Sequence, residues 1–174
     1  RKFWNGNCMN TIPTITKNLL IINALMFLGT IVAQSYGVDL ARYLGLHFFL
    51  AEDFNAAQLI TYMFMHATFS HLLFNMFALW MFGCVVENVW GPKKFLFYYI
   101  SCGIGAGLFQ EAAQFGQFYL MAVDQIPNFS FDDIGTVAHN SAALLNQFTT
   151  VGASGAIYAI LLAFGMIFPE ERIF

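Results

Sequence analysis

Apolar residues gather in four long stretches separated by more polar segments. The stretches cover residues 18–36, 71–89, 95–114 and 154–168. A helix that crosses the hydrocarbon core of a bilayer needs roughly 17–25 such residues. The fourth stretch is short, so its helix is expected to begin near Val151 or to be buried against protein. The pattern predicts an all-α integral membrane protein, a polytopic bundle with four transmembrane helices.

Two mixed segments connect these stretches. Residues 37–70 alternate apolar and polar positions without a full span, which suits helices at the membrane interface. Residues 115–150 contain Asp124, Asp132, Asp133 and Pro127 and are polar enough to leave the bilayer. We therefore expect an N-terminal segment at 1–17, a membrane domain at 18–168, and at 169–174 the start of a connection to a further span.

The positive charges predict the orientation. Six of the seven basic residues fall at one end of the expected spans: Arg1, Lys2, Lys17, Lys93, Lys94 and Arg172. Only Arg42 falls at the other end. Basic residues favour the cytoplasmic side. The N-terminus is expected in the cytoplasm, and segments 37–70 and 115–150 are expected to face out.

Composition agrees with a membrane protein and excludes some other classes. Hydrophobic residues make up 59% of the chain and charged residues 10%, against about 45–50% and 25% in soluble domains. The net charge of −3 and the absence of a basic stripe give no sign of nucleic-acid binding. The three cysteines match no metal motif and are interpreted as small core residues. No cofactor is expected.

Polar residues occur at the expected outer ends of two spans. His71 and Asn75 are four residues apart, so they share one helix face. Ser154, between Gly152 and Gly155, opens the fourth stretch from the same side. Polar groups at membrane depth need partners or a function. A hydroxyl, an imidazole and an amide at one depth suit acyl transfer, which needs a nucleophile and oxyanion donors.

Each of these features has a structural explanation when taken alone. The Gly-x-Ser-Gly sequence often only helps helices to pack, and a histidine at a helix end is more often structural. His66 and His71 are five residues apart and lie on different helix faces, so a metal site is not expected.

Taken together, the motifs resemble the rhomboid family of intramembrane serine proteases. They are His66-x4-His71-x3-Asn75, Glu87-x3-Gly91, and Gly152-Ala153-Ser154-Gly155-Ala156-Ile157-Tyr158, in this order. The resemblance extends from about Thr11 to Phe168. It implies a six-helix core, of which residues 18–168 would be the first four helices, a partial rhomboid domain. It also implies cleavage of transmembrane segments near the outer membrane surface.

The resemblance also implies a role for each matching residue. Ser154 matches the nucleophile, and His71 and Asn75 match the oxyanion-stabilising side chains. His66 matches a structural histidine that hydrogen-bonds the loop before the second span. Tyr158 matches a ring that packs against the catalytic histidine. Glu87 and Gly91 match positions at the cytoplasmic end of the second span.

Two departures stand out. The Trp-Arg pair of the family's first outer loop reads Ala57-Gln58 here, which puts the anchoring of that loop in doubt. The family's general base is a histidine on the sixth span, and no histidine follows Ser154 in this chain. His71 as base would be lost from the oxyanion site, and His139 lacks an apolar frame. His47 is expected to cap a helix or to face water.

The hypothesis from sequence is therefore an intramembrane serine endopeptidase in a bacterial-type inner membrane. Its partners would be transmembrane protein substrates and the lipid bilayer. The alternative is a non-catalytic rhomboid-like protein that binds transmembrane helices. A transporter or channel is disfavoured, because it predicts charged residues in mid-span, and the candidate found is Glu111, near the outer end of the third span.

We predict that residues 1–174 expressed alone do not cleave a transmembrane substrate, because they lack the expected general base. The measurement is turnover of a model substrate by the purified fragment in detergent or liposomes. Turnover would show that one of the four histidines present acts as the base.

Overall fold

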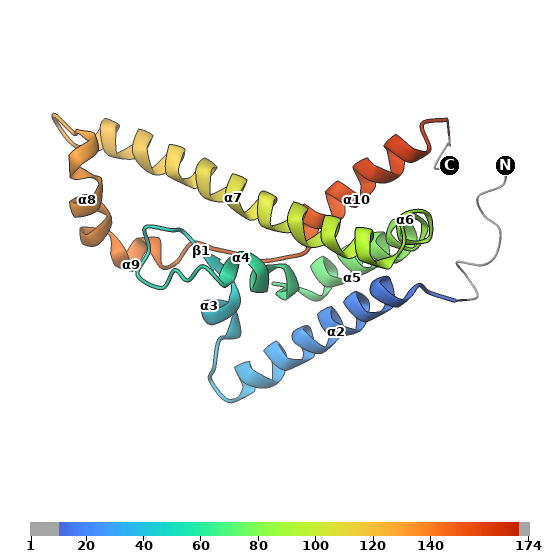
Figure 1. The fold of residues 1–174 in the computed structure, drawn as a ribbon. Helices are drawn as coiled ribbons and strands as arrows, with labels where there is room; N and C mark the ends of the chain where they lie inside the picture. The colour runs from blue at the N-terminus through green and yellow to red at the C-terminus, as the bar shows by residue number, and fades with distance from the viewer. Residues whose placement is uncertain (1–10, 171–174) are drawn as a thin grey trace.

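The computed structural model describes residues 11–170, which form a helical bundle (Figure 1). The helices are α2 (Thr14–Ser35), α3 (Leu40–Leu44), α4 (Gln58–Thr61), α5 (Phe69–Ala78), α6 (Cys84–Trp90), α7 (Pro92–Gln125), α8 (Ile134–Asn140), α9 (Ala142–Leu145) and α10 (Ser154–Ile167), with 3-10 turns η1 (Tyr62–Phe64) and η3 (Phe131–Asp133) and a π-helical segment η2 (Leu79–Gly83). Two short strands, β1 (Leu46–His47) and β2 (Thr149–Thr150), pair antiparallel.

Helices form at all four predicted spans, although they differ in how well they suit a membrane. By length and hydropathy, two helices of residues 11–170 could cross a bilayer, Thr14–Ser35 and Phe69–Trp90. These correspond to the first and second predicted spans. Helix α10 is apolar but has 14 residues. Helix α7 is longer than any of them, but polar residues such as Gln110, Glu111 and Gln114 lower its hydropathy.

The second of these spans contains a π-helical segment. Helices α5 and α6 are joined through η2 without a break, so Phe69–Trp90 is one continuous helix. In a π-helix each hydrogen bond spans one residue more than in an α-helix. Leu79, Phe82 and Gly83 of this segment are buried, and η2 packs against α2 and α10. The wide turn therefore lies in the centre of the bundle.

Helices α7 and α10 pack closely because small residues meet at their interface. A β-carbon on Gly155 would overlap the β-carbon of Ala106. The hydroxyl of Tyr98 donates a hydrogen bond of 2.9 Å to the carbonyl of Ala159. The Gly103–Gly107 spacing on α7 has the same effect toward η1, because Gly103 lies against Met63 and its carbonyl accepts a 2.7 Å bond from the Tyr62 hydroxyl.

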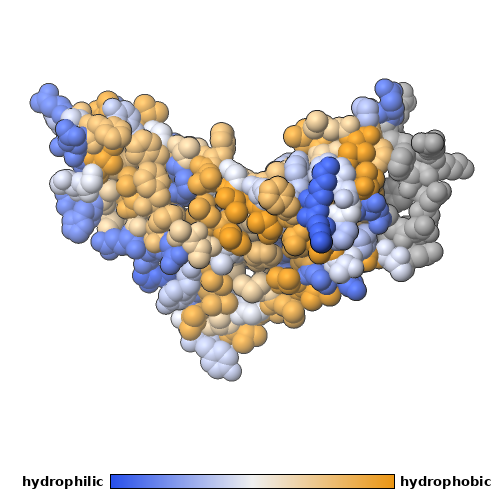
Figure 2. All heavy atoms as spheres, viewed as in Figure 1, coloured by the Kyte–Doolittle hydropathy of each residue, from blue (hydrophilic) through white to orange (hydrophobic). Residues whose placement is uncertain are grey.

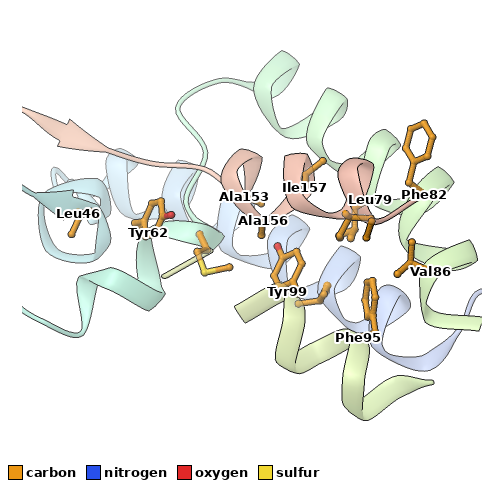
Figure 3. Packing of buried hydrophobic residues seen from close by; sticks show 14 residues of the cluster. Leu46, Tyr62, Leu79, Phe82, Val86, Phe95, Tyr99, Ala153, Ala156 and Ile157 are labelled. Carbon is orange, nitrogen blue, oxygen red and sulfur yellow. The ribbon is translucent and has the colours of Figure 1, made fainter. Parts of the chain in front are cut away.

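The core is one apolar cluster at the crossing of the long helices (Figure 3). Tyr99 and Phe95 of α7 are completely buried against side chains from α2, the α5–α6 helix and α10. Ala153, Ala156, Ile157 and Ile160 supply the contact face of α10. Helix α10 thus packs against the core from its first turn onward. Because Ser154 is in that turn, this packing determines its position along the bundle.

Segment 115–150 is largely helical and not an irregular connection. Helix α7 continues to Gln125, about eleven residues past the predicted end of the span, because no proline occurs before Pro127. Helices α8 and α9 follow (Figure 1). They bury a second small core against the first connection: Phe48, Ala51, Ala138 and Leu145, with Phe115 and Phe118 packed against it.

The surface agrees with a protein that meets lipid over its middle. Many large apolar side chains are exposed, among them Leu25, Phe74 and Phe97, at 60%, 72% and 75% of their surface. Figure 2 shows apolar residues covering the middle of one face, with hydrophilic residues toward its left edge, near the connection of α7 to α8. Exposed apolar area of this extent is typical of a lipid-facing or partner-facing surface.

A buried carboxylate joins α2 to the end of α6. Glu87 is 3% exposed. It accepts hydrogen bonds from the backbone N–H groups of Ile15 and Thr16, at 2.9 and 2.7 Å, and from the Thr16 hydroxyl at 2.8 Å. These N–H groups belong to the first turn of α2 and have no acceptor within the helix. The negative charge also lies at the positive end of the helix dipole.

We predict that Glu87→Ala lowers the free energy of unfolding by at least about 2 kcal/mol, because buried donors of α2 lose their acceptor. Thermal unfolding in detergent measures the change. Glu170→Gln, at an exposed position, is the control and should unfold like the wild type. An unchanged melting temperature for Glu87→Ala would contradict the assigned role.

Candidate active site

The polar face of α5 is set by a cap at its first turn. The Thr68 side chain accepts a 3.1 Å hydrogen bond from the backbone N–H of His71, as expected of a threonine N-cap. His71 and Asn75 follow on the same face, one turn apart. Asn75 is 7% exposed, and its Nδ2 has no hydrogen-bond partner among residues 11–170. The site therefore contains a buried donor that is not used.

Gly152 lies directly against this face. A β-carbon at Gly152 would be 2.6 Å from His71 Cε1, 2.8 Å from His71 Nε2 and 3.8 Å from Asn75 Nδ2. Its φ of +123° is one that other residues rarely adopt. Its N–H donates a 2.9 Å hydrogen bond to the carbonyl of Tyr62. Residue 152 must be glycine for both reasons, and the structure brings together Gly152, His71 and Asn75.

Ser154 follows two residues later as the first residue of α10. Its side chain is half-buried. The first N–H groups of α10 have no acceptor within the helix, and the N-cap residue, Ala153, supplies no side-chain acceptor for them. Gly155 serves the contact with Ala106 on α7. Gly152 therefore allows close contact with the imidazole of His71, and Gly155 allows close contact with α7.

His66 lies behind His71. The two ring centroids are 5.1 Å apart, and the planes meet at 65°. His66 is 3% exposed. Neither ring nitrogen has a hydrogen bond of good geometry within residues 11–170, but the backbone of Phe64, in the loop before the second span, interacts with the ring. Burial lowers the pKa of His66 to about 4, and the neighbouring His71 acts in the same direction. His66 is thus a neutral ring packed against His71.

Tyr158 lies on the exposed side of α10, with 72% of its surface accessible. It is one helical turn after Ser154. The face of α10 that begins at Ser154 continues outward through Tyr158, Leu162 and Met166, all strongly exposed. This face is therefore open along the whole helix.

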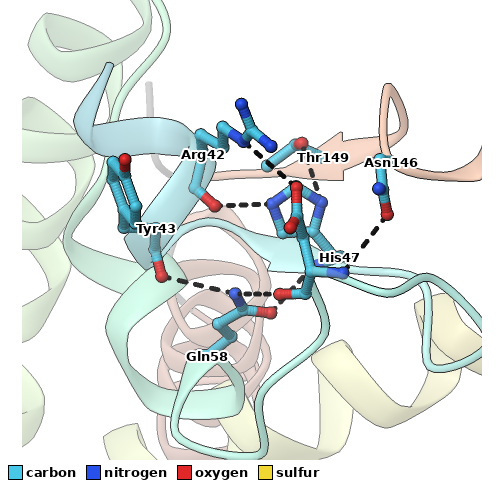
Figure 4. Close-up of polar contacts among 7 residues, drawn as sticks. Arg42, Tyr43, His47, Gln58, Asn146 and Thr149 are labelled. Carbon is cyan, nitrogen blue, oxygen red and sulfur yellow. Dashed lines mark hydrogen bonds and ion pairs between the residues drawn. The ribbon is translucent and has the colours of Figure 1, made fainter. Parts of the chain in front are cut away.

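Gln58 anchors the first connection, which contains no Trp-Arg pair (Figure 4). It is 3% exposed. Its Oε1 accepts hydrogen bonds from the backbone N–H groups of His47 and Asn55, at 3.2 and 3.1 Å. Its Nε2 donates to the carbonyls of Tyr43 and Asp53, at 3.3 and 3.0 Å. One buried amide thus holds four points of the loop, and the doubt raised by the Ala57-Gln58 departure is resolved.

Of the two expected roles of His47, the structure shows the cap and not exposure to water: its ring contacts the carbonyl of Arg42, in the last turn of α3. Its side chain is 1% exposed. Its Nε2 lies 2.7 Å from the carbonyl of Arg42 and must donate to it, and its Nδ1 lies 3.4 Å from the Thr149 hydroxyl (Figure 4). The alternation of apolar and polar residues at 37–70 gave no sign of this burial.

The His47 contacts connect the first loop to the segment that precedes Ser154. The β1–β2 register pairs His47 with Thr149 and Leu46 with Thr150. Two residues after Thr150, the N–H of Gly152 reaches the carbonyl of Tyr62. Residues 149–152 are therefore held by backbone hydrogen bonds at both ends before α10 begins. Sequence reasoning did not find Tyr62 as a support of the site, since a backbone carbonyl has no sequence signal.

The remaining histidine is remote from this site. His139 is on α8, and its Nδ1 lies 3.8 Å from a carboxylate oxygen of Glu52, with both side chains mostly exposed. Within residues 11–170, no group of three or more His, Cys, Asp or Glu side chains could hold a metal ion. Arg1, Lys2 and Arg172, which entered the prediction of the orientation, and Cys8, one of the three cysteines, lie outside the described residues.

Comparison with known proteins matches this arrangement to one family. The family model for the rhomboid domain matches residues 53–174, which is most of the chain. The chain belongs to the rhomboid family. The matched region contains every residue of the candidate site, from His66 to Tyr158.

Three named rhomboid proteins are similar to parts of this chain. Rhomboid protein 1, mitochondrial, from Saccharomyces cerevisiae is 26% identical over 76% of this chain and 32% of its own length. Rhomboid protease AarA from Providencia stuartii is 36% identical over 58% of this chain and 30% of its own. Rhomboid protease GluP from Bacillus subtilis is 40% identical over 27% and 9%. The chain thus spans a third or less of each relative. No solved structure gives a significant match.

We predict that Gly152→Ala destabilises this rhomboid chain, because the new methyl group would overlap the His71 ring and the backbone would be strained at positive φ. Gly105→Ala is the matched control, since nothing lies within 4 Å of its β-carbon position. Thermal unfolding should show a loss of about 1–3 kcal/mol for the first variant alone. Equal melting temperatures for the two variants would refute the close contact.

We predict a pH dependence of stability from His66. Because its pKa falls from 6.5 in the unfolded chain to about 4 in the fold, the unfolded state binds the proton more tightly. The folded state is favoured above pH 6.5, and this preference is lost as the pH falls toward 4. Melting temperatures of wild type and His66→Gln, measured between pH 7 and 4, should converge as the pH drops. A constant difference would contradict the shift.

Proposed function

We propose that this rhomboid chain carries the nucleophile and the oxyanion site of an intramembrane serine endopeptidase. Ser154 attacks the carbonyl carbon of a substrate peptide bond. The tetrahedral oxyanion receives hydrogen bonds from His71, Asn75 and the backbone N–H of Ser154. His66, Gly152, Gly155 and Tyr158 support these groups. Membership of the rhomboid family and two relatives named as proteases support this reading.

The observation that carries the proposal is the contact between Gly152 and the polar face of α5. It brings the segment two residues before Ser154 against His71 and close to the amide of Asn75. Asn75 Nδ2 is buried without a partner among the described residues, and a buried unpaired donor costs about 1–3 kcal/mol. Such a cost is understandable where the donor is reserved for a charge that develops during reaction.

The general base is the part of the mechanism that the described histidines do not supply well. His47 has hydrogen-bond partners at both ring nitrogens, and His139 is exposed beside Glu52. His66 is buried behind His71 with a pKa of about 4. In the proposal, a histidine from a sixth span C-terminal to Phe174 takes the proton of Ser154, as the family resemblance implies. The proton then passes to the amine of the leaving fragment.

The substrates of the proposed enzyme are transmembrane segments of other proteins, cleaved near the outer face of a bacterial-type inner membrane. The N-terminus would be cytoplasmic, and the chain would cross the membrane several times. Six basic residues at one end of the spans and Arg42 at the other support this orientation. The exposed apolar surface over the middle of the bundle supports contact with lipid (Figure 2).

We expect Ser154→Ala in the full-length protein to abolish cleavage of a model transmembrane substrate. His71→Ala and Asn75→Ala should each lower kcat by roughly 10²–10³, because each removes one oxyanion donor. Gln34→Ala, at an exposed position on α2, should cleave like the wild type. Equal cleavage by wild type and Ser154→Ala would refute the proposal.

The same assay distinguishes the enzyme from the alternative, which is a rhomboid that binds transmembrane helices without cutting them. It predicts that wild type and Ser154→Ala both leave the substrate intact and both retain it in a pull-down from detergent. The enzyme proposal predicts that the wild type releases two fragments.

A further inference from the structure

A cavity of about 500 Å³ lies between the last turns of α7 and helices α8 and α9. Phe48, next to His47 of β1, also lines it. No residue of the candidate active site contributes to its walls. In Figure 1, α8 and α9 lie beside the far end of α7, away from its start at Pro92. The cavity is therefore a separate feature on the part of α7 that extends past the predicted span.

The two walls of the cavity differ in chemistry. On one side, α7 contributes Phe118, Met121 and Ala122 together with four glutamines: Gln110, Gln114, Gln117 and Gln125. Their spacing of four, three and eight residues keeps them along one helix face. The opposite wall, from α8, α9 and the residues after them, is mostly apolar: Val137, Leu144, Leu145 and Phe148. Gln114 Oε1 is buried without a hydrogen-bond partner among the described residues.

We propose that this groove binds an extended polypeptide segment, namely the extramembrane part of the substrate next to the cleaved bond. Carboxamides both donate to carbonyls and accept from N–H groups, so a row of them matches a peptide backbone. Successive side chains of an extended chain point to opposite faces, and alternate ones can meet the apolar wall. An acyl chain would fill the apolar side but would offer no hydrogen bond to the amides, so Gln114 Oε1 would stay buried and unpaired.

This inference rests on the proposed protease function, and the position of the groove agrees with it. Gly155 of α10 meets Ala106 of α7, and Ala159 meets Tyr98, so the two helices run antiparallel. Ser154 is therefore level with the turn of α7 around Ala106. Gln110 follows four residues later, about 6 Å further along the helix at 1.5 Å per residue. A chain leaving Ser154 in this direction meets the groove immediately.

The length of the glutamine row defines the length of the segment. Gln110 and Gln125 are fifteen residues apart on α7, which is about 22 Å. An extended peptide covers this distance with about seven residues at 3.3 Å each. About two further residues bridge the step from Ser154 to Gln110. The segment recognised is thus roughly residues two to nine on the extramembrane side of the scissile bond.

The groove is also connected to the nucleophile segment. Phe148 lines the cavity, and the next residue, Thr149, begins β2. Strand β2 leads to Gly152 and Ser154 through the contacts with His47 and Tyr62. A peptide held against Phe148 therefore lies next to the strand that positions the nucleophile.

Photocrosslinking tests the site without depending on cleavage. The full-length protein with Ser154→Ala receives a benzophenone amino acid in place of Met121, which lines the cavity. A matched variant receives it in place of Leu28, an exposed residue of α2. The ligand is a model transmembrane substrate with a nine-residue juxtamembrane segment. We expect a crosslink to that segment from position 121 and none from position 28.

Kinetics then measure the contribution of the amides. In the otherwise wild-type protein, the double variant Gln114→Leu/Gln117→Leu should raise KM roughly tenfold for the long substrate, because two amide partners are lost. Its activity on a substrate that ends two residues beyond the scissile bond, and so does not reach the glutamines, should stay unchanged. Gln34→Leu on α2 is the control and should affect neither substrate.

The outcomes separate this inference from the proposed function. If position 121 crosslinks to lipid alone, or to nothing, the peptide groove is refuted, even if the wild-type protein cleaves the substrate. If the crosslink to the segment forms but wild type does not cleave, the groove stands and the protease proposal fails. Equal tenfold losses on the long and the truncated substrates would also overturn the groove, because they would indicate general damage to the fold.

Discussion

The close approach of Gly152 to His71 is the contact on which the candidate site depends. A backbone without a β-carbon, at a φ that suits glycine, allows the loop before α10 to lie against the imidazole and near the Asn75 amide. The Tyr62 carbonyl holds that loop through the Gly152 N–H. Any larger residue would move the start of α10 away from α5 and would separate Ser154 from the groups expected to assist it.

Buried polar side chains hold the fold around this contact. Glu87 closes the open N–H groups of α2, and Gln58 ties together four backbone positions of the first connection. His47 extends the second network to Thr149. In a bilayer, moving an apolar side chain from lipid to protein changes its environment little, so apolar contacts alone position helices weakly. Directional hydrogen bonds give helices and loops defined positions. The second network ends at Thr149, in the segment that leads to Ser154.

Hydrophobic stretches were sufficient to predict the long helices, but not their ends. The second stretch, expected at 71–89, corresponds closely to Phe69–Trp90, because its apolar run is bounded by Thr68 and Gly91. The third was expected to end near residue 114 but runs to Gln125. Glutamine and alanine interrupt a strongly apolar run, yet both are good helix formers. The end of the apolar run was therefore not the end of the helix.

The candidate site was predictable as a set of residues, while its supports were not. His71, Asn75 and Ser154 are recognisable because polar residues at the ends of apolar stretches are rare. Gly152 could be suspected from the motif, but its contact with a particular imidazole is a property of the assembled helices. The roles of His47 and Gln58 depend on partners distant in sequence, including Thr149. Local patterns contain no information on such pairs.

The π-helical turn at Leu79–Gly83 sets the rotational phase of the whole second span. In a regular α-helix, Asn75 and Glu87 would point about 120° apart around the axis, at about 100° per residue. One extra residue in a turn removes about 100° of that angle. Asn75 and Glu87, 7% and 3% exposed, can therefore both point inward. A single inserted residue thus allows one helix to present the Asn75 amide of the candidate site at one end and the Glu87 cap of α2 at the other.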